Sequence, residues 1–138
     1  EIGATHAVNR RETPDIAARI KEITGGGAHY AIDTTGVPAI IKTALAGLRF
    51  LGTAVVLGVT GDLTINVQEE LMGEAKSLIG IVEGDAIPKL FIPELLDYYK
   101  QGRFPFDRLV TFYDFTDINR AFEESHKGKA IKAVLRIG

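Results

Sequence analysis

The chain has 138 residues, 46% of them hydrophobic and 25% charged, which is the composition of an ordinary globular domain rather than of a disordered segment. Its 16 lysine and arginine residues nearly balance 18 aspartate and glutamate residues, so the basic excess typical of nucleic-acid-binding proteins is absent. The chain contains no cysteine, which excludes disulfides, thiolate nucleophiles and cysteine-based zinc sites.

The first third begins the alternation of short apolar runs and helix-like stretches that is typical of βαβ units around a parallel sheet. A short strand is expected at residues 6–8. Residues 13–24 are predicted to form a helix, because their apolar side chains recur at helical spacing. Thr13 is the candidate N-cap of this helix, and the glycines at 25–27 are expected to end it.

The alternation continues through the rest of the chain. Residues 53–59 form an unbroken apolar run, which predicts a central strand covered on both faces of the sheet. The other expected strands are 28–33, 77–82, 108–115 and 130–137, with an extended piece at 63–67; the expected helices are 38–48, 68–75, 87–101 and 116–126. The apolar face expected to point inward on the helix 87–101 is made of Leu90, Phe91, Leu95, Leu96 and Tyr99.

Three of the expected strands end in glycine-containing turns, at 33–36, 57–61 and 80–84. Parallel sheets bind ligands at the carboxyl ends of their strands, and glycine lets a ligand approach the backbone. Each glycine can equally serve only to make a tight turn, but three such turns together favour a ligand-binding edge. Asp33, at the first of these ends, is expected to cap the following turn rather than to act as a general base.

Other candidate sites are weaker. The histidines His6, His29 and His126 lack the paired spacing of metal ligands, so no metal site is expected in this chain. No serine lies in a Gly-x-Ser-x-Gly context, which leaves no hydrolase nucleophile. Glu83 and Asp85 are interpreted as surface or cofactor-edge groups rather than as proton donors.

No apolar run approaches a membrane span, and the first residues lack the basic and apolar regions of a signal peptide. We therefore expect a cytoplasmic protein without membrane or nucleic-acid partners. Because Glu1 opens on what reads as the middle of a fold, we also expect the chain to be part of a longer one.

Over its whole length the chain resembles the C-terminal part of the zinc-type, medium-chain alcohol dehydrogenases, and within them it is most similar to aryl (benzyl) alcohol dehydrogenases. The order and spacing of several short blocks carry this resemblance, and no single block is decisive. The blocks are residues 2–5, 8–9, 30–36, 53–59, 80–85 with Pro88, 102–109, 118–121 and 128–136.

The resemblance implies an α/β fold in two parts. Residues 1–101 are expected to form the second half of a Rossmann-type, doubly wound dinucleotide-binding domain, and residues 102–138 the C-terminal α+β segment of the catalytic, GroES-like domain. The family's GxGxxG turn, its acidic ribose-binding residue and its zinc ligands are not in this sequence. The choice between NAD and NADP is therefore left open.

The resemblance also implies which residues contact the cofactor. Four groups are implied: Thr34, Thr35 and Gly36 beside the adenosine half, Leu57, Gly58 and Val59 along the nicotinamide ribose, Ile81, Val82 and Glu83 at the carboxamide, and Lys132 at the pyrophosphate. No catalytic residue and no metal ligand of the family falls within the chain.

The implied reaction is hydride transfer between an aromatic primary alcohol and NAD or NADP, with zinc in the parent enzyme polarising the alcohol oxygen. The chain alone is expected to be inactive. A homodimer paired through the strand 77–82 is expected, as in similar family members. Two alternatives stay open: a zinc-independent, quinone reductase-like member of the same superfamily, and a stand-alone binding or assembly module.

Overall fold

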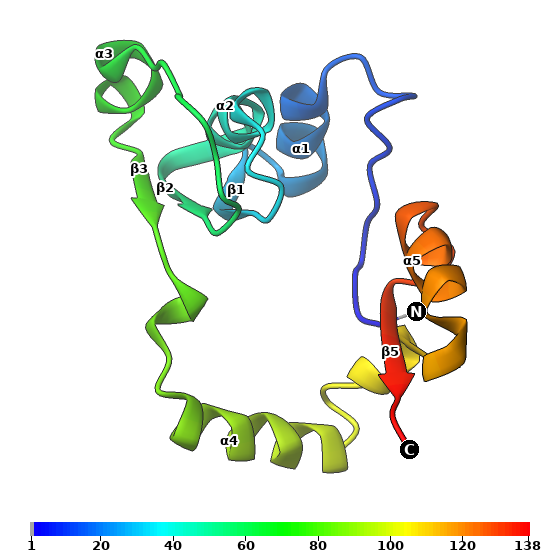
Figure 1. The fold of residues 1–138 in the computed structure, drawn as a ribbon. Helices are drawn as coiled ribbons and strands as arrows, with labels where there is room; N and C mark the ends of the chain where they lie inside the picture. Colours follow the sequence, from blue (N-terminus) through cyan, green and yellow to red (C-terminus); the bar gives the residue numbers. More distant parts are fainter. Residues whose placement is uncertain (1) are drawn as a thin grey trace. The chain divides into compact units, whose positions relative to one another are not determined.

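The structure is a computed structural model that describes residues 2–138. The chain folds into two compact units, Gly3–Ala86 and Ile87–Gly138 (Figure 1). The domains expected from the resemblance meet instead at residues 101 and 102. The difference between the two divisions is the helix Pro88–Lys100, which groups with the second unit.

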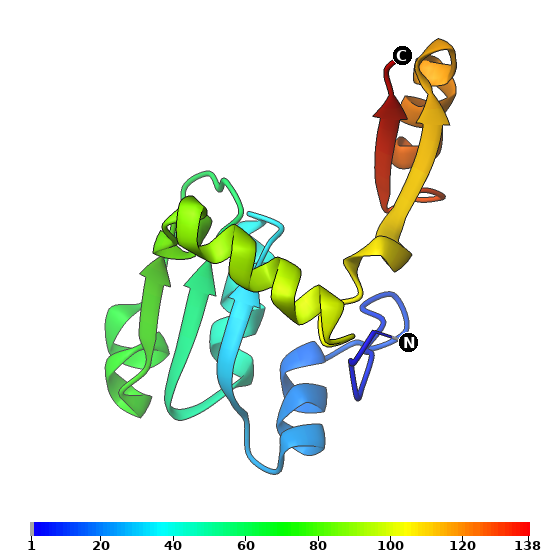
Figure 2. The ribbon, with the colours of Figure 1, turned by 90° about the horizontal axis from the view of Figure 1, so that it is seen from below.

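A three-stranded parallel sheet organises the first unit, with the strand order β1-β2-β3 (Figure 2). As expected, the strand formed from the apolar run is the central one. The elements in chain order are α1 (Ile16–Thr24), β1 (Ala28–Asp33), α2 (Pro38–Gly47), β2 (Leu48–Val56), α3 (Val67–Glu70) and β3 (Ser77–Gly80), with short 3-10 turns at Met72–Glu74 and Glu83–Asp85.

The ends of α1 follow from local hydrogen bonding. The predicted N-cap, Thr13, is wrong: Asp15 holds that position in extended conformation, and its carboxylate accepts a 2.9 Å hydrogen bond from the amide of Ala18. The predicted stop is confirmed, because Gly25 takes the left-handed conformation with φ 66° and donates back to the last helical carbonyls.

The core of this unit lies on one face of the sheet, where α1 and α2 pack together (Figures 1 and 2). Its buried centre is made of Leu45, Leu48 and Ala54. On the other face, Tyr30 and Ile32 of β1 are 74% and 66% exposed. In the central strand β2, Gly52 and Ala54 are buried, whereas Thr53 and Val55 on the other face are half-buried, so the expectation that this strand is covered on both faces is met only in part.

Three sequence expectations differ from the structure. Residues 6–8 form no strand, because a segment becomes a strand only when a neighbouring strand takes up its amides and carbonyls. The central strand begins at Leu48 rather than at residue 53, through an irregularity in its pairing with β1. The third strand ends at Gly80 rather than at residue 82.

The second unit begins with α4 (Pro88–Lys100) and continues with β4 (Val110–Asp114), α5 (Ile118–His126) and β5 (Lys132–Arg136), with 3-10 turns at Phe106–Leu109 and Phe115–Asp117. The strands β4 and β5 are parallel, and α5 covers one of their faces. Tyr113, Ala121 and Ala130 form the buried centre, where the Tyr113 hydroxyl donates a 2.6 Å hydrogen bond to Glu124.

The apolar face of α4 is exposed rather than inward as predicted. Leu90 is 69% exposed, and Phe91, Leu96 and Tyr99 are also exposed. Within its unit this face is met by Phe106, whose ring centroid lies 4.8 Å from that of Tyr99. Helical periodicity identifies which face of a helix is apolar, but it does not identify the surface that covers it.

Candidate functional site

Asp33 closes the carboxyl end of β1 and is the one charged residue among those described that is buried as a whole, at 4% exposure. Its carboxylate accepts hydrogen bonds from the Thr35 hydroxyl at 2.7 Å, from the Gly36 amide at 2.8 Å and from the Thr35 amide at 3.2 Å. The Thr35 hydroxyl, together with these two amides, holds the pKa of Asp33 below its usual value, although burial opposes the shift. Asp33 therefore caps this turn as an anion, as expected.

The ends of β1 and β2 are joined through their backbones. The Asp33 carbonyl accepts from the amides of Leu57 and Gly58 at 2.9 and 3.3 Å. A Cβ built on Gly58 would lie 2.2 Å from the Gly36 nitrogen, and one built on Gly36 would lie 2.0 Å from the Val59 carbonyl oxygen. These two glycines are thus required by the contact between two turns of the protein itself.

The end of β3 contains the glycine turn expected at 80–84, with a backbone conformation that the sequence does not reveal. Ile81 extends the sheet by donating a 3.1 Å hydrogen bond to the Val56 carbonyl. Glu83, Gly84 and Asp85 then all have positive φ, at 50°, 67° and 53°. Glycine adopts this conformation freely and aspartate tolerates it, whereas Glu83 holds backbone strain of about 1–3 kcal/mol. The glycine at 84 is the single signal of this turn in the sequence.

The structure therefore brings nine of the ten predicted site residues to one edge of the sheet. They are Thr34, Thr35, Gly36, Leu57, Gly58, Val59, Ile81, Val82 and Glu83, at the carboxyl ends of β1, β2 and β3. The Val59 side chain is fully exposed at this edge, and Val82 is also exposed. Backbone groups on exposed turns of this kind are suited to hydrogen bonding with a bound ligand.

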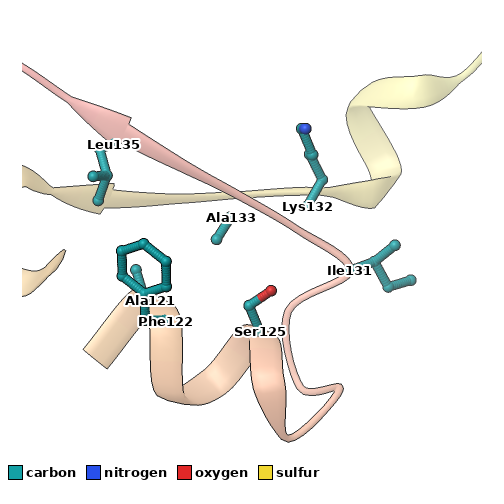
Figure 3. A pocket seen from close by; sticks show the side chains of 7 residues that line it. All are labelled: Ala121, Phe122, Ser125, Ile131, Lys132, Ala133 and Leu135. Carbon is teal, nitrogen blue, oxygen red and sulfur yellow. The ribbon is translucent and has the colours of Figure 1, made fainter. Parts of the chain in front are cut away.

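Lys132, the tenth residue, belongs to the second unit and opens β5, where it pairs in register with Val110. It lines a hollow of about 290 Å³ between α5 and β5, together with Phe122 and Ile131 among others. Figure 3 shows its side chain pointing away from α5, whereas Ala133 points toward that helix. Lys132 is exposed and forms no ion pair within the described residues.

Over residues 2–138, no group of three His, Cys, Asp or Glu side chains is placed to hold a metal ion. The ring of His6 contacts the Thr5 hydroxyl, and the ring of His29 contacts Arg49. Among the helices of this part of the chain, none has the length and apolar character needed to cross a membrane.

Comparison with known proteins gives the same family along the whole chain. The model of the zinc-binding dehydrogenase family matches residues 1–100. Geraniol dehydrogenase from Castellaniella defragrans is 43% identical over 98% of this chain and 37% of its own length. The crystal structure of benzyl alcohol dehydrogenase from Acinetobacter calcoaceticus has a TM-score of 0.93 at 42% identity, over 99% of this chain and 38% of its own.

An alcohol dehydrogenase zinc-binding domain protein from Burkholderia ambifaria matches equally well, with a TM-score of 0.93 and 42% identity over 99% of this chain and 37% of its own. These matches confirm the α/β fold with parallel sheets and the resemblance read from the sequence. The chain spans 37% of the length of the curated relative that it matches at 43% identity. The chain belongs to the zinc-binding dehydrogenase family.

Proposed function

We propose that this chain is the cofactor-holding part of a cytoplasmic alcohol dehydrogenase that transfers a hydride between an aromatic primary alcohol and NAD or NADP. The observation that carries the proposal is the single edge at which three parallel strands end in exposed turns. The names of the relatives, geraniol dehydrogenase and benzyl alcohol dehydrogenase, favour a primary alcohol in which the carbon that carries the hydroxyl is bonded to an unsaturated carbon.

In this proposal the three turns of the edge bind successive parts of the dinucleotide, mainly through backbone groups. The roles are adenosine contacts for Thr34, Thr35 and Gly36, nicotinamide-ribose contacts for Leu57, Gly58 and Val59, and carboxamide contacts for Ile81, Val82 and Glu83. The left-handed turn at Glu83–Asp85 supports the last role, because backbone strain in proteins concentrates at ligand-binding segments.

The chemical step itself lies outside these residues. Zinc, where the complete protein binds it, would polarise the alcohol oxygen and lower its pKa. The described residues offer no ligand set for zinc, so no step through the metal is assigned to them. Their share is to orient the dinucleotide, so that the nicotinamide is presented to the alcohol in a fixed position.

Lys132 provides the test of this proposal, because its exposed ammonium has no partner in the second unit and is free to pair with a phosphate. In a full-length protein that contains this chain, Lys132→Ala should weaken NAD(P) binding by about 1–3 kcal/mol. Lys129→Ala, an exposed lysine three residues away, is the control and should leave binding unchanged. Equal dissociation constants for the two variants, measured by isothermal titration, would contradict the role of Lys132.

The chain alone should bind NAD and NADP no more tightly than roughly millimolar, about −4 kcal/mol, because its turns reach only one side of the cofactor. Titration of either dinucleotide into the purified chain measures this. A micromolar dissociation constant, or turnover of benzyl alcohol in the presence of added zinc, would contradict the proposal that this chain only helps to hold the cofactor and that the chemical step needs residues outside it.

We also propose that two copies pair through β3. This strand lies at one end of the sheet order, so one row of its amides and carbonyls has no strand beside it within the described residues. Its exposed Ile79 adds apolar area to that edge. Sedimentation of the chain over a range of concentrations should show a dimer, and Ile79→Lys should shift it toward monomer. A wild-type chain that stays monomeric at high concentration would refute the pairing.

A further inference from the structure

The amino ends of β1 and β2 carry an irregularity that the proposed function does not use. Ala28 pairs with Leu48, and the next pair is Tyr30 with Thr53. Four residues of β2, from Arg49 to Gly52, therefore stand opposite a single residue of β1, His29. This bulge lies at the end of the sheet opposite the carboxyl-end turns. It is larger than an ordinary β-bulge, which inserts one extra residue, but like a β-bulge it interrupts the strand pairing and redirects side chains.

The bulge is fixed by its surroundings. A Cβ built on Gly27 would lie 2.5 Å from the Arg49 amide nitrogen, and one built on Gly52 would lie 2.9 Å from the Arg49 carbonyl oxygen, so both glycines are in close contact with its backbone. Leu51 takes a left-handed conformation with φ 62°. Strain held in a rigid segment is a reason to look for a ligand there.

An open hollow of about 340 Å³ lies beside the bulge and is lined by His29, Tyr30, Arg49, Phe50 and Leu51. Phe50 and Leu51 are 62% and 69% exposed, although both are large and apolar. Arg49 donates a 2.9 Å hydrogen bond to Nε2 of His29, because a guanidinium cannot accept one. No carboxylate lines the hollow, and Arg49 forms no ion pair within residues 2–138.

We propose that this hollow binds a small aromatic carboxylate. The free donors of Arg49 match the two oxygens of a carboxylate, and the hydrogen bond to His29 holds the guanidinium in place. Tyr30 and Phe50 supply apolar walls on which a planar ring can stack. A bare phosphate would use the charge of Arg49 but leave these walls in water. The inference is independent of the cofactor edge, which lies at the other ends of the strands.

The test is a titration of the chain with benzoate, followed by amide correlation spectra. Saturable shifts are expected at residues 29–30 and 49–51, with a dissociation constant of roughly millimolar. Benzamide, which lacks the charge, and inorganic phosphate, which lacks the ring, should each bind at least about tenfold more weakly. These two probes separate a site for aromatic carboxylates from a nonspecific apolar or anionic surface.

Arg49→Gln should weaken benzoate binding by roughly tenfold or more. The control is Arg19→Gln, since Arg19 is an exposed arginine already paired with Glu22 at 2.6 Å, and it should leave binding unchanged. If Arg49→Gln perturbs the fold, Arg49→Lys is the second variant. It keeps the positive charge but not the paired donors of the guanidinium, so it should bind benzoate more weakly than the wild-type chain and more tightly than Arg49→Gln. The proposal is overturned if the two Gln variants weaken benzoate binding equally, or if the benzoate-induced amide shifts lie outside residues 29–30 and 49–51. It is also overturned if phosphate binds as tightly as benzoate, or if these amides do not shift when benzoate is added to a full-length protein that contains the chain.

Discussion

The close contact between the turns after β1 and β2 makes Gly58→Ala a sharp test of how the proposed cofactor edge is built. The added Cβ would lie 2.2 Å from the Gly36 nitrogen and 2.8 Å from the Thr35 carbonyl carbon, all of them backbone atoms. To reach even the 3.4 Å of an ordinary contact, the two turns must separate by 3.4 − 2.2, or about 1.2 Å. Because backbone atoms cannot rotate away as a flexible side chain can, the turns themselves have to move.

That displacement has a calculable effect on stability. Overpacking of a rigid contact costs about 1–3 kcal/mol. A shift of this size also disrupts the 2.8 Å hydrogen bond from the Gly36 amide to the Asp33 carboxylate, and a bond to a charged group contributes about 1.5–3 kcal/mol. We therefore expect Gly58→Ala to lower the free energy of unfolding of the first unit by about 3 kcal/mol or more.

Gly61→Ala is the matched control, because Gly61 has no atom within 4 Å of its built Cβ and its φ is not positive. It should change stability by no more than about 0.5 kcal/mol. Native-state hydrogen exchange of the β2 amides measures both variants, and the amides of the second unit serve as an internal reference. Equal exchange rates in the two variants would refute the argument from backbone contact.

Two further predictions concern single residues of the same unit. Asp33→Asn should lower the free energy of unfolding near neutral pH by about 1–3 kcal/mol. Because hydrogen bonds lower the folded-state pKa of Asp33, its contribution is present above the unfolded pKa of about 3.9 and is lost as pH falls through the lower folded value. Urea unfolding between roughly pH 2 and 6 should show a shallower acid slope for the variant, and an unchanged slope would refute this. Leu51→Gly should raise the free energy of unfolding by about 0.5–1 kcal/mol, because it removes left-handed strain. The control is Ile32→Gly, in an ordinary strand, which should lower the free energy of unfolding. If thermal melts show that both variants are less stable than the wild-type chain, the argument from strain at Leu51 is refuted.

The parts of the fold that depend on local rules could be predicted from the sequence. The strand Ala28–Asp33 and the helix beginning at Pro38 lie where their patterns place them, and Gly25 ends α1 as a left-handed cap. The capping role of Asp33 also follows from its position, since an acidic residue at a strand end has its own backbone amides within reach. These features are set by residues within a few positions of one another.

The features that the sequence did not reveal depend on contacts between distant segments. The apolar pattern of α4 shows which face is hydrophobic, yet that face is exposed in its unit, because amphipathicity carries no information about the partner surface. The start of β2 was predicted at residue 53, where the run 53–59 begins. In the structure the strand begins before the bulge, where Leu48 pairs with Ala28.

Backbone strain explains why the sequence predicted the two candidate sites only in part. A positive φ is predicted from sequence mainly where glycine, asparagine or aspartate occupies the position, but the left-handed residues here also include Leu51, Ala75 and Glu83. Such residues persist only where neighbouring structure holds them, as Gly27 and Gly52 hold the bulge. Leu51 lies beside the proposed aromatic-carboxylate hollow and Glu83 within the proposed cofactor edge, whereas Ala75 ends the 3-10 turn before β3 and belongs to neither site. Strain at Leu51 and at Glu83 therefore motivates two separate ligand tests, whereas Ala75 shows that a left-handed residue also occurs where no ligand is proposed.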